Sequence, residues 1–579
     1  MLPVGLGRRR LLVWAVPLLT LVTISASGSV AVLASTDAPA TGASATGAAA
    51  AGPVARSVAS CASLAAADLS RLDTRVVSAA DVTRNGVGFC DVKGYISPQT
   101  QFEVLLPETT WRGDYLQQGC GGFCGQSGVN LQDPSRTSGY QAAFPPLANG
   151  EMVVAADDQG HEAPTNIDGL WGRDDPQLRV VFGYSSEHSL AVTAKALIRA
   201  FYGMGPAHSF FDGVSDGGHE ALDLAQRYPA DFDGILAGAP ANNWAPLVGL
   251  AEPWFVLANT DASGRPILTA DKLPALHAAV MAACADRYGV IRDPRACSFD
   301  PAAIGCPAGG DRPDCLTAAQ VRVVRMEYRG PTDRRGRNLF DGGQPYGSEL
   351  TWAFWLIPAD GQRTPTDTIA GQLGLNYLKY LAYWRNPPDT FTLRDVRFTE
   401  ATYRRLEILG GIYNATDPDL RAFRAHGGKL IIYHGWADQA IPPFESVDYY
   451  AAVARQLGGY AATRSFSRLY MVPGLYHCPC GQPVDGDPAT VVDFMAPLVR
   501  WVEAGQAPAA VELPVTSQTT GARLRALTVQ PFNPLLPPPR NNGLNSNYRY
   551  IGRIGVYRTG NELWCTQRGS ALVCSQHRS

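Results

Sequence analysis

The sequence predicts an α/β fold in which helices cover both faces of a mostly parallel sheet and one long insertion interrupts the sheet. Short apolar runs typical of buried strands alternate with helical stretches from about Cys61 to Asn243. The alternation stops between Asn243 and Asp417, and it returns at Gly428. We therefore expect a sheet domain in two parts, residues 60–243 and 418–579, around an inserted domain of residues 244–417.

The first 34 residues predict an export signal. Three arginines precede an apolar stretch over residues 11–34, which contains small-x-small cleavage sites near Ala26 or Ala34. A signal anchor is the alternative, but the loss of apolarity after Ile24 disfavours it. The Arg-Arg pair fits twin-arginine export as well as the general route. We expect a secreted, extracellular protein without a stable membrane span.

The segment that follows, residues 35–59, predicts a flexible leader. It consists mainly of Ala, Gly, Thr and Ser, which bury too little apolar surface to offset the entropy of ordering. The net charge of −3 gives no basic field, so no nucleic-acid partner is expected. Nothing in the sequence indicates an oligomeric state.

Twelve cysteines fit an exported chain that uses disulfides. Closeness in sequence predicts four local pairs, Cys61–Cys90, Cys284–Cys297, Cys306–Cys315 and Cys565–Cys574. The other four, Cys120, Cys124, Cys478 and Cys480, stay unassigned: the first two bond each other or do not, and Cys478 pairs with Cys480 or stays free. A metal cluster at His477-Cys478-Pro479-Cys480 is disfavoured because no second ligand pair stands at zinc-site spacing.

Individual elements follow from apolar patterning. The expected strands are FEVLLP, YLQQ, EMVVAAD, HSFF, DGILAG, KLIIYHG and RLYMV. The expected helices are SEHSLAVTAKALIRAFYG, EALDLAQRY, FESVDYYAAVARQLGG and ATVVDFMAPLVRWVEAG. The insertion holds helical pieces such as TADKLPALHAAVMAACADRYG but no second run of buried strands. The tail after Gln530 should be an extended connection. Near the C-terminus, YRYIGRIGVYR and LWCTQRGSALVC alternate as in a small hairpin pinned by a disulfide.

Ser215 is the candidate nucleophile. It lies between Gly213 and Gly217, after the run HSFF and before a helix. This Gly-x-Ser-x-Gly pattern is typical of a nucleophile elbow, in which a strand turns sharply into a helix and leaves the serine Oγ exposed. The pattern alone is weak, and the strand and helix around it make it informative.

A serine needs a base to accept its proton and a carboxylate to orient that base. In the α/β-hydrolase fold the chain order is Ser, acid, His, with the acid and the His after late strands. Asp438 follows KLIIYHGWA and His477 follows RLYMVPG, so both fit. Alone, Asp438 would be interpreted as a turn aspartate and His477 as an ordinary loop histidine. Of the other histidines, His434 could face the pocket, whereas His161, His188 and His219 fit packed or solvent positions.

An esterase-type reaction also needs donors for the developing oxyanion. One should be the backbone N–H of Asp216, next to the nucleophile. The second should come from the loop GCGGFCG, residues 119–125, with Gly121 or Gly122 as the donor. The alternative is a plain glycine-rich turn.

With these segments assembled, the chain resembles the tannase and feruloyl esterase family, which also contains the bacterial enzyme that hydrolyses mono(2-hydroxyethyl) terephthalate. The matching stretches are GCGGFCG, VVAADDQGH, FFDGVSDGGHEAL, YHGWADQAIPP and MVPGLYHC. The resemblance implies an α/β-hydrolase fold with Ser215, Asp438 and His477 as nucleophile, acid and base. It also implies that the insertion is a lid supplying most of an aromatic-substrate pocket.

The sequence departs from the family pattern in two places. Family members usually bond a cysteine before the nucleophile to the cysteine after the catalytic His, but the first position here is Val214. The family's calcium loop between two cysteines is rich in Asp and Gly, whereas residues 284–297 retain only Asp286 and Asp293. Calcium prefers six to eight oxygen ligands, so we expect no metal and no other cofactor.

The sequence therefore predicts a secreted serine esterase for esters of aromatic or phenolic acids, with a small aromatic ester as its partner and an acyl-enzyme at Ser215. A secreted serine peptidase of the same fold is one alternative. A binding protein that keeps the fold without turnover is another. Neither the acyl group nor the alcohol follows from the sequence.

Overall fold

The structure is a computed structural model that describes residues 54–131, 144–359, 361–477, 488–517, 520, 522–536, 563–568 and 571–576. Side chains are described for all of these except residues 488, 489 and the last two ranges. The predicted signal and most of the predicted leader lie outside the described residues. At the end of that leader, the backbone N–H groups of Ala55 and Val58 donate to the carbonyls of Trp111 and Phe201.

A nine-stranded sheet forms the centre of the molecule, in the order β1-β2-β3-β5-β4-β6-β7-β8-β9. The pairs from β1 to β5 are antiparallel, and every pair from β5 to β9 is parallel. The strands are β1 (Thr74–Arg84), β2 (Val87–Ile96), β3 (Thr100–Pro107), β4 (Asp114–Gln118), β5 (Met152–Asp157), β6 (His208–Val214), β7 (Gly234–Gly238), β8 (Lys429–Gly435) and β9 (Ser467–Val472). This mostly parallel sheet confirms the predicted fold class.

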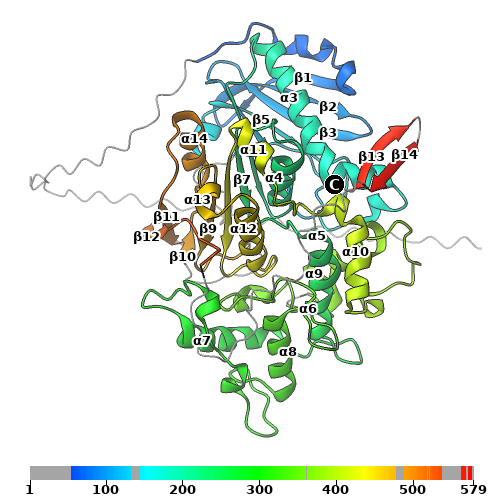
Figure 1. Cartoon of the computed structure of the whole chain (residues 1–579), viewed down its shortest axis with the longest axis vertical. Helices are drawn as coiled ribbons and strands as arrows, with labels where there is room; N and C mark the ends of the chain where they lie inside the picture. Colours follow the sequence, from blue (N-terminus) through cyan, green and yellow to red (C-terminus); the bar gives the residue numbers. More distant parts are fainter. Residues whose placement is uncertain are drawn as a thin grey trace, which may run out of the picture. The chain divides into compact units, whose positions relative to one another are not determined.

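Two apolar layers cover the sheet because its inner strands are buried on both faces. One layer joins the sheet to the helices α3 (Ser186–Tyr202), α4 (Asp216–Arg227), α11 (Arg421–His426) and α12 (Phe444–Gln456). The other joins it to α1 (Pro145–Ala148) and α14 (Met495–Ala504). Figure 1 shows α3 running beside the N-terminal strands, which are drawn in blue. Two short helices complete this part, α2 (Pro176–Val180) and α13 (Tyr460–Thr463).

The segment between β7 and β8 is helical, as predicted, and its described residues add no strand to the central sheet. Up to Tyr413 its helices, green to yellow in Figure 1, are α5 (Trp244–Pro246), α6 (Glu252–Ala258), α7 (Leu273–Cys284), α8 (Ala318–Arg329), α9 (Ile369–Asn376) and α10 (Glu400–Tyr413). These helices share an apolar core with Phe123 and Phe182 of the sheet region, whereas α11, just before β8, packs on the sheet. The described residues belong to one compact unit. The boundaries of a separate inserted domain stay a prediction.

The C-terminal region contains two further sheets. One holds β10 (Pro488–Thr490), β11 (Val511–Ser517) and β12 (Arg523–Val529), and the other is a hairpin of β13 (Leu563–Arg568) and β14 (Ala571–Gln576). The hairpin lies in the predicted stretch LWCTQRGSALVC, whereas YRYIGRIGVYR lies outside the described residues. The predicted helix from Ala489 begins only at Met495, because residues 488–490 pair with β11 and Val491 donates its N–H to Pro514.

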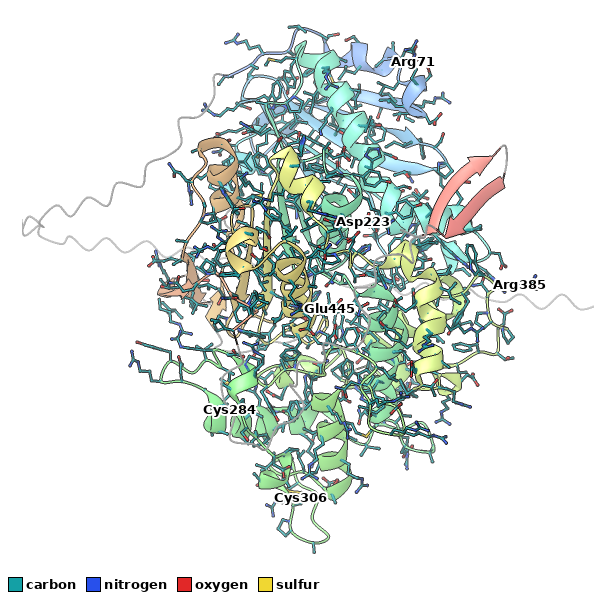
Figure 2. All side chains as sticks on the ribbon, in the orientation of Figure 1. Arg71, Asp223, Cys284, Cys306, Arg385 and Glu445 are labelled. Carbon is teal, nitrogen blue, oxygen red and sulfur yellow. A yellow bond between two sulfur atoms is a disulfide. The ribbon has the colours of Figure 1, made fainter. Side chains whose placement is uncertain are left out.

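Four disulfides join described cysteines. Cys61–Cys90, Cys284–Cys297 and Cys306–Cys315 confirm three predicted pairs, and Cys120–Cys124 settles a pair that the sequence left open. Figure 2 labels Cys284 and Cys306, in the helical segment. Cys478 and Cys480 lie outside the described residues. Cys565 stands opposite Cys574 in the hairpin, but their side chains are not described.

None of the helices in the described part of the chain combines the length and apolarity needed to cross a membrane.

Candidate active site

Ser215 occupies the sharp turn between β6 and α4. Its backbone has φ 68° and ψ −117°, a conformation that non-glycine residues seldom adopt. A Cβ on Gly213 would lie 2.2 Å from the carbonyl oxygen of Gly217, and one on Gly217 would lie 2.9 Å from that of Cys120. Glycine is therefore required at both positions, and the turn has the form of a nucleophile elbow.

His477 joins Ser215 to Asp438. Its Nε2 lies 3.0 Å from Ser215 Oγ, and its Nδ1 lies 2.8 Å from Asp438 Oδ2. The three residues follow β6, β8 and β9, and the carboxyl ends of parallel strands meet at one edge of a sheet. The fold thus brings together the three residues that the sequence selected, at hydrogen-bond distance and in the order of a Ser-His-Asp chain.

Asp438 is fully buried, and each of its oxygens has a separate role. Oδ1 accepts the backbone N–H groups of Ala440 and Ile441 at 2.9 and 2.8 Å, so the turn-aspartate interpretation also holds. Oδ2 faces His477 and His434. Burial alone would raise the pKa of Asp438, but the neighbouring His477 and the hydrogen bonds from His434 and His477 hold that pKa well below its ordinary value.

His434 lies behind the Asp438 carboxylate and does not line the cavity. Its Nε2 is 3.3 Å from Asp438 Oδ2 and 3.0 Å from the carbonyl oxygen of Ile441. Both of these atoms are acceptors, so Nε2 carries a proton and donates to the carboxylate, and Nδ1 lies 2.8 Å from Ser446 Oγ. His434 is the sixth residue of β8 and Asp438 lies in the turn after that strand, so only the folded structure reveals that the two side chains meet.

The loop of residues 119–125 lies against the elbow. Gly217 donates its N–H to the Cys120 carbonyl at 2.7 Å, and the Cys120–Cys124 disulfide closes a short ring within the loop. Gly121 and Gly122 both line the cavity beside Ser215. Asp216 is the first residue of α4, so its backbone N–H has no acceptor within the helix. Gly121 and Gly122 thus line the same cavity as the nucleophile, and Asp216 follows it directly in the chain.

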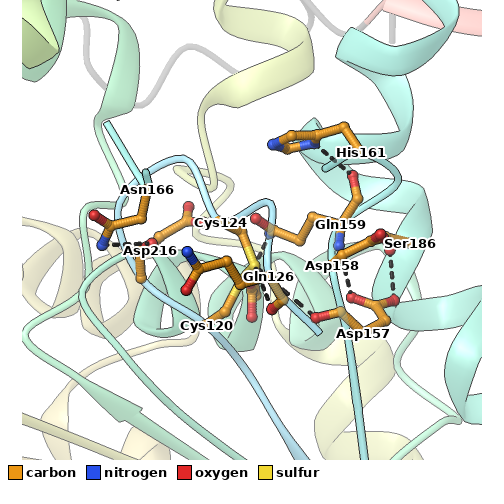
Figure 3. Close-up of a disulfide and its surroundings, with 12 residues drawn as sticks. Cys120, Cys124, Gln126, Asp157, Asp158, Gln159, His161, Asn166, Ser186 and Asp216 are labelled. Carbon is orange, nitrogen blue, oxygen red and sulfur yellow. Dashed lines mark hydrogen bonds between the residues drawn. A yellow bond between two sulfur atoms is a disulfide. The ribbon is translucent and has the colours of Figure 1, made fainter. Parts of the chain in front are cut away.

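Buried acidic side chains lie beside this loop, and Figure 3 shows Asp216 and Asp157 near the Cys120–Cys124 disulfide. Glu220 accepts from the side-chain amide of Gln159, and the disulfide sulfur of Cys120 lies 3.4 Å from its Oε1. Burial raises the pKa of both Glu220 and Asp216. Asp216 Oδ1 also lies 3.2 Å from Nδ1 of His219. Neither carboxyl has a Lys or Arg partner among the described residues, so burial works against the ionised form of each, and for Asp216 the neighbouring His219 opposes this effect. His219 is therefore a packed histidine, as expected.

The remaining two histidines also fit the packing interpretation. His161 stacks on Trp171 with ring centroids 3.8 Å apart, and burial lowers its pKa to about 4. His188 pairs with Asp231 at 2.6 Å and stacks on Tyr228.

A cavity of about 660 Å³ opens at Ser215 and His477. The helical segment supplies one wall through Trp244, Leu247, Val248, Glu252, Trp355, Ile369 and Leu373. The Trp355 ring lies 5.7 Å from the His477 ring. Glu252 was not among the predicted site residues, because an acid at the start of a helix is common on surfaces. Here its side chain is buried in the cavity wall.

The loop between Cys284 and Cys297 does not fit a calcium ion. Asp286 accepts the N–H groups of Tyr288 and Val290 and pairs with Arg292 at 2.7 Å. Asp293 pairs with Arg295, also at 2.7 Å. Both carboxylates of the loop are thus already neutralised by arginine, and two acids are too few for a calcium site.

Comparisons with known proteins agree with this site. The family described as "Tannase and feruloyl esterase" matches residues 81–543. The chain is 33% identical over 504 residues to an uncharacterized esterase of Xanthomonas campestris pv. campestris, covering 78% of this chain and 83% of the relative. It is 28% identical over 491 residues to the mono(2-hydroxyethyl) terephthalate hydrolase of Piscinibacter sakaiensis, covering 72% and 77%.

Solved structures share the fold. Feruloyl esterase B from Aspergillus oryzae has a TM-score of 0.68 at 22% identity, covering 82% of this chain and 96% of that one. Tannin acyl hydrolase from Aspergillus niger has a TM-score of 0.61 at 21% identity, covering 87% and 90%. These likenesses confirm the α/β-hydrolase fold. From the family match and the close relatives together, the chain belongs to the tannase and feruloyl esterase family and is a carboxylic ester hydrolase.

Proposed function

We propose that the protein is a secreted serine esterase that hydrolyses esters of aromatic or phenolic acids through an acyl-enzyme at Ser215. The observation that carries the proposal is the hydrogen-bonded chain from Ser215 through His477 to Asp438 at the floor of a cavity. A serine needs such a base at neutral pH, and the base needs an acid to fix its tautomer. No metal or other cofactor enters the proposal.

In this mechanism His477 Nε2 accepts the Ser215 proton while Oγ attacks the ester carbonyl carbon. The carbonyl oxygen becomes an oxyanion, which accepts from the backbone N–H of Asp216 and from that of Gly121 or Gly122. Asp438 stabilises the imidazolium that forms. His477 then protonates the leaving alcohol, and the acyl group stays on Ser215. Water, deprotonated by His477, attacks the acyl-enzyme and releases the acid.

Aromatic substrates are supported by the walls of the cavity. Trp244 and Trp355 line it together with aliphatic side chains of the helical segment, and such a lining suits a flat ring. The names of the terephthalate and feruloyl relatives point to aromatic acids as well. We assign residues 244–417 the role of a lid that holds the ring. Export is supported by the four disulfides among described cysteines.

Kinetics of single variants test the nucleophile and the base. Ser215→Ala and His477→Ala should each lower kcat on an aromatic methyl ester by about 10³-fold or more, since the triad acts as a unit. Circular dichroism should show a native fold for both variants. Ser189→Ala is a matched control, because the Ser189 hydroxyl bonds within α3 away from the cavity. A folded Ser215→Ala protein that keeps most of its activity would rule out the mechanism.

Two further assays separate the alternatives. A fluorophosphonate probe should label the wild type at Ser215, whereas a binding protein without turnover would not react. Esters should be cleaved in preference to peptide anilides, whereas a peptidase would cleave both.

A further inference from the structure

The described lining of the cavity contains acids but no fixed cation. Among its described lining residues, the ionisable side chains are Asp157, Asp212, Glu252 and His477, with neither Lys nor Arg. A carboxylate on a bound substrate would lose its water there without gaining a positive partner, and that loss is costly. The cavity therefore suits an uncharged ring.

Glu252 is the acid placed to contact such a ring. It is the first residue of α6 and directly follows a π-helical turn, Leu247–Ala251, of which Leu247 and Val248 also line the cavity. π-helical turns are frequent at functional sites. The residue is only 3% exposed, yet its Oε2 has no hydrogen-bond partner among the described residues. A buried polar atom of this kind needs a partner, and the cavity is the place from which one can come.

The surroundings of Glu252 favour its protonated form. Burial raises the pKa of Glu252 to about 8; the indole of Trp355 opposes the increase, and the charge of Asp438 adds to it. Its other acidic neighbour is Glu327 of α8, which is fully buried with both carboxyl oxygens unpartnered in the described part of the chain. At neutral pH the Glu252 carboxyl is thus both a donor and an acceptor.

Trp355 contacts both the predicted base, His477, and Glu252. Its ring lies 5.7 Å from the His477 ring, and its indole N–H interacts with the Glu252 carboxyl. The contact falls outside hydrogen-bond geometry, so that N–H has no hydrogen-bond acceptor among the described residues. Trp355, Glu252, Ser215 and His477 all line one cavity. An aromatic ring whose ester is bound at Ser215 is therefore enclosed together with the indole and Glu252.

We propose that Glu252 binds a hydroxyl group on the aromatic ring of the ester, and that the cavity selects against esters whose ring carries a carboxylate. The assignment rests on the proposed serine-esterase function and narrows its substrates to phenolic esters. A site built to hydrogen-bond a hydroxyl rejects the analogue that lacks it, because its buried polar group is then left unpaired. The same site disfavours the carboxylate analogue, because that carboxylate would lose its bound water without gaining a positive partner.

Three esters test the assignment with the full-length wild type: methyl 4-hydroxycinnamate, methyl cinnamate and the methyl ester of 4-carboxycinnamic acid. We expect kcat/KM to fall at least tenfold from the first to the second and at least a hundredfold from the first to the third. Equal values for the first two, or a preference for the anionic ester, overturn the assignment of Glu252. No turnover of any of the three overturns the proposed function itself.

Substitutions at Glu252 test whether this residue causes the difference in kcat/KM between the esters. Glu252→Leu should lower the ratio of kcat/KM between the hydroxylated and the unsubstituted ester at least tenfold, whereas Glu252→Gln, which keeps a donor and an acceptor, should retain most of the ratio. Glu327→Leu is the matched control, because Glu327 is buried beside Glu252 but is not among the cavity-lining residues. A ratio that Glu252→Leu leaves intact contradicts the assignment. The three-ester comparison decides the question even if that variant does not fold.

Discussion

Asp438 shows how one carboxylate is held by both its turn and its neighbours. Two backbone N–H groups fix Oδ1, and two imidazoles face Oδ2. His434 is the less expected of the two imidazoles, because its side chain is fully buried and does not line the cavity. By donating to the carboxylate it stabilises the charged form and orients the carboxylate toward His477. We therefore interpret His434 as a positioning residue for the base.

His434→Phe should lower kcat by about 10- to 100-fold with little change in KM. The change removes one hydrogen bond to a charged group, which is worth about 1.5–3 kcal/mol, and His434 does not itself line the cavity. Steady-state kinetics on a phenolic methyl ester measures both constants. His426→Phe, the same substitution on an exposed face of α11, is the control. A folded His434→Phe enzyme with wild-type kcat would leave His434 a purely structural role.

The sequence predicted Ser215, Asp438 and His477 because the chemistry fixes their residue types, their order and their places after strands. It could not predict His434 or Glu252. The direction in which the His434 side chain points depends on how α12 packs against the end of β8. Glu252 stands at the start of a helix, where a glutamate is common whether it faces solvent or a cavity. Such side chains acquire a role only from tertiary packing.

At the scale of elements, the glycine loop and the elbow form one unit. The carbonyl of Cys120 accepts from Gly217, the disulfide closes the loop, and Phe123 donates to the Asn166 carbonyl at 2.6 Å. The family's disulfide beside the nucleophile has no counterpart at Val214. In its place the described residues offer a disulfide inside the oxyanion loop. We infer that this ring helps to hold the loop N–H groups in the cavity.

Gly122→Ala and Gly121→Ala should differ sharply in activity. Gly122 has φ 70°, and a Cβ there would lie 2.2 Å from the carbonyl oxygen of Asn166, so the loop must shift. A Cβ on Gly121 would meet nothing within 4 Å. Loss of one oxyanion donor costs about 10²–10³ in kcat. We expect at least a tenfold fall in kcat for Gly122→Ala and a smaller one for Gly121→Ala. Similar values for the two would show that loop geometry is not critical.

Chelation should leave the stability unchanged. Asp286 and Asp293 of the loop between Cys284 and Cys297 are each paired with arginine, which leaves no set of oxygens for calcium. The melting temperature should therefore be the same with excess EDTA and with millimolar calcium. A fall on chelation that calcium restores would contradict this, because a ligand that binds only the native state raises its stability.

Among the elements, the inner parallel strands were predicted, but β1, β2, β11 and β12 were not. β1 is exposed along most of its length, with only Thr74 and Val76 buried, so it lacks the apolar run that marked the inner strands. β2 is largely buried, but Asp91, Lys93 and Gly94 interrupt its apolar run. β11 and β12 share an apolar cluster with α14. The start of α14 was placed too early for a related reason. Residues 488–490 read equally well as helix or strand until β11 is present to pair with them.

At the scale of the whole molecule, several buried carboxyls among the described residues have raised pKa values. Burial raises the pKa of Asp158 to about 8, with the charge of Asp157 adding to it. It also raises the pKa of Glu252 to about 8 and that of Asp341 to about 7. In the unfolded chain these groups titrate near 4. Folding therefore takes up protons between about pH 4 and pH 8.

These pKa shifts determine whether the stability of the fold rises or falls with pH. Wherever the native state binds more protons than the unfolded state, stability falls as pH rises. His161 acts in the opposite direction, because its lowered pKa makes the unfolded state the better proton binder below about pH 6.5. The lowered pKa of Asp438 matters only below its unfolded value. From pH 6.5 to 8 the raised carboxyls act without this opposition from His161.

The melting temperature should therefore fall measurably between pH 6.5 and pH 8, and the protein should be more stable at the mildly acidic end. Asp158→Asn should reduce that fall, since it removes a proton that the native state holds and the unfolded state has lost. The amide keeps an oxygen for the N–H groups of Gln101 and Gly160, which Oδ1 of Asp158 now accepts. Asp389→Asn, at a side chain 74% exposed, is the control and should keep the wild-type slope. Thermal melts at pH 6.5 and pH 8 in the same buffer measure the change in melting temperature for each variant. A melting temperature that rises toward pH 8, or an Asp158→Asn variant with an unchanged slope, would mean that these carboxyls are ionised in the folded protein.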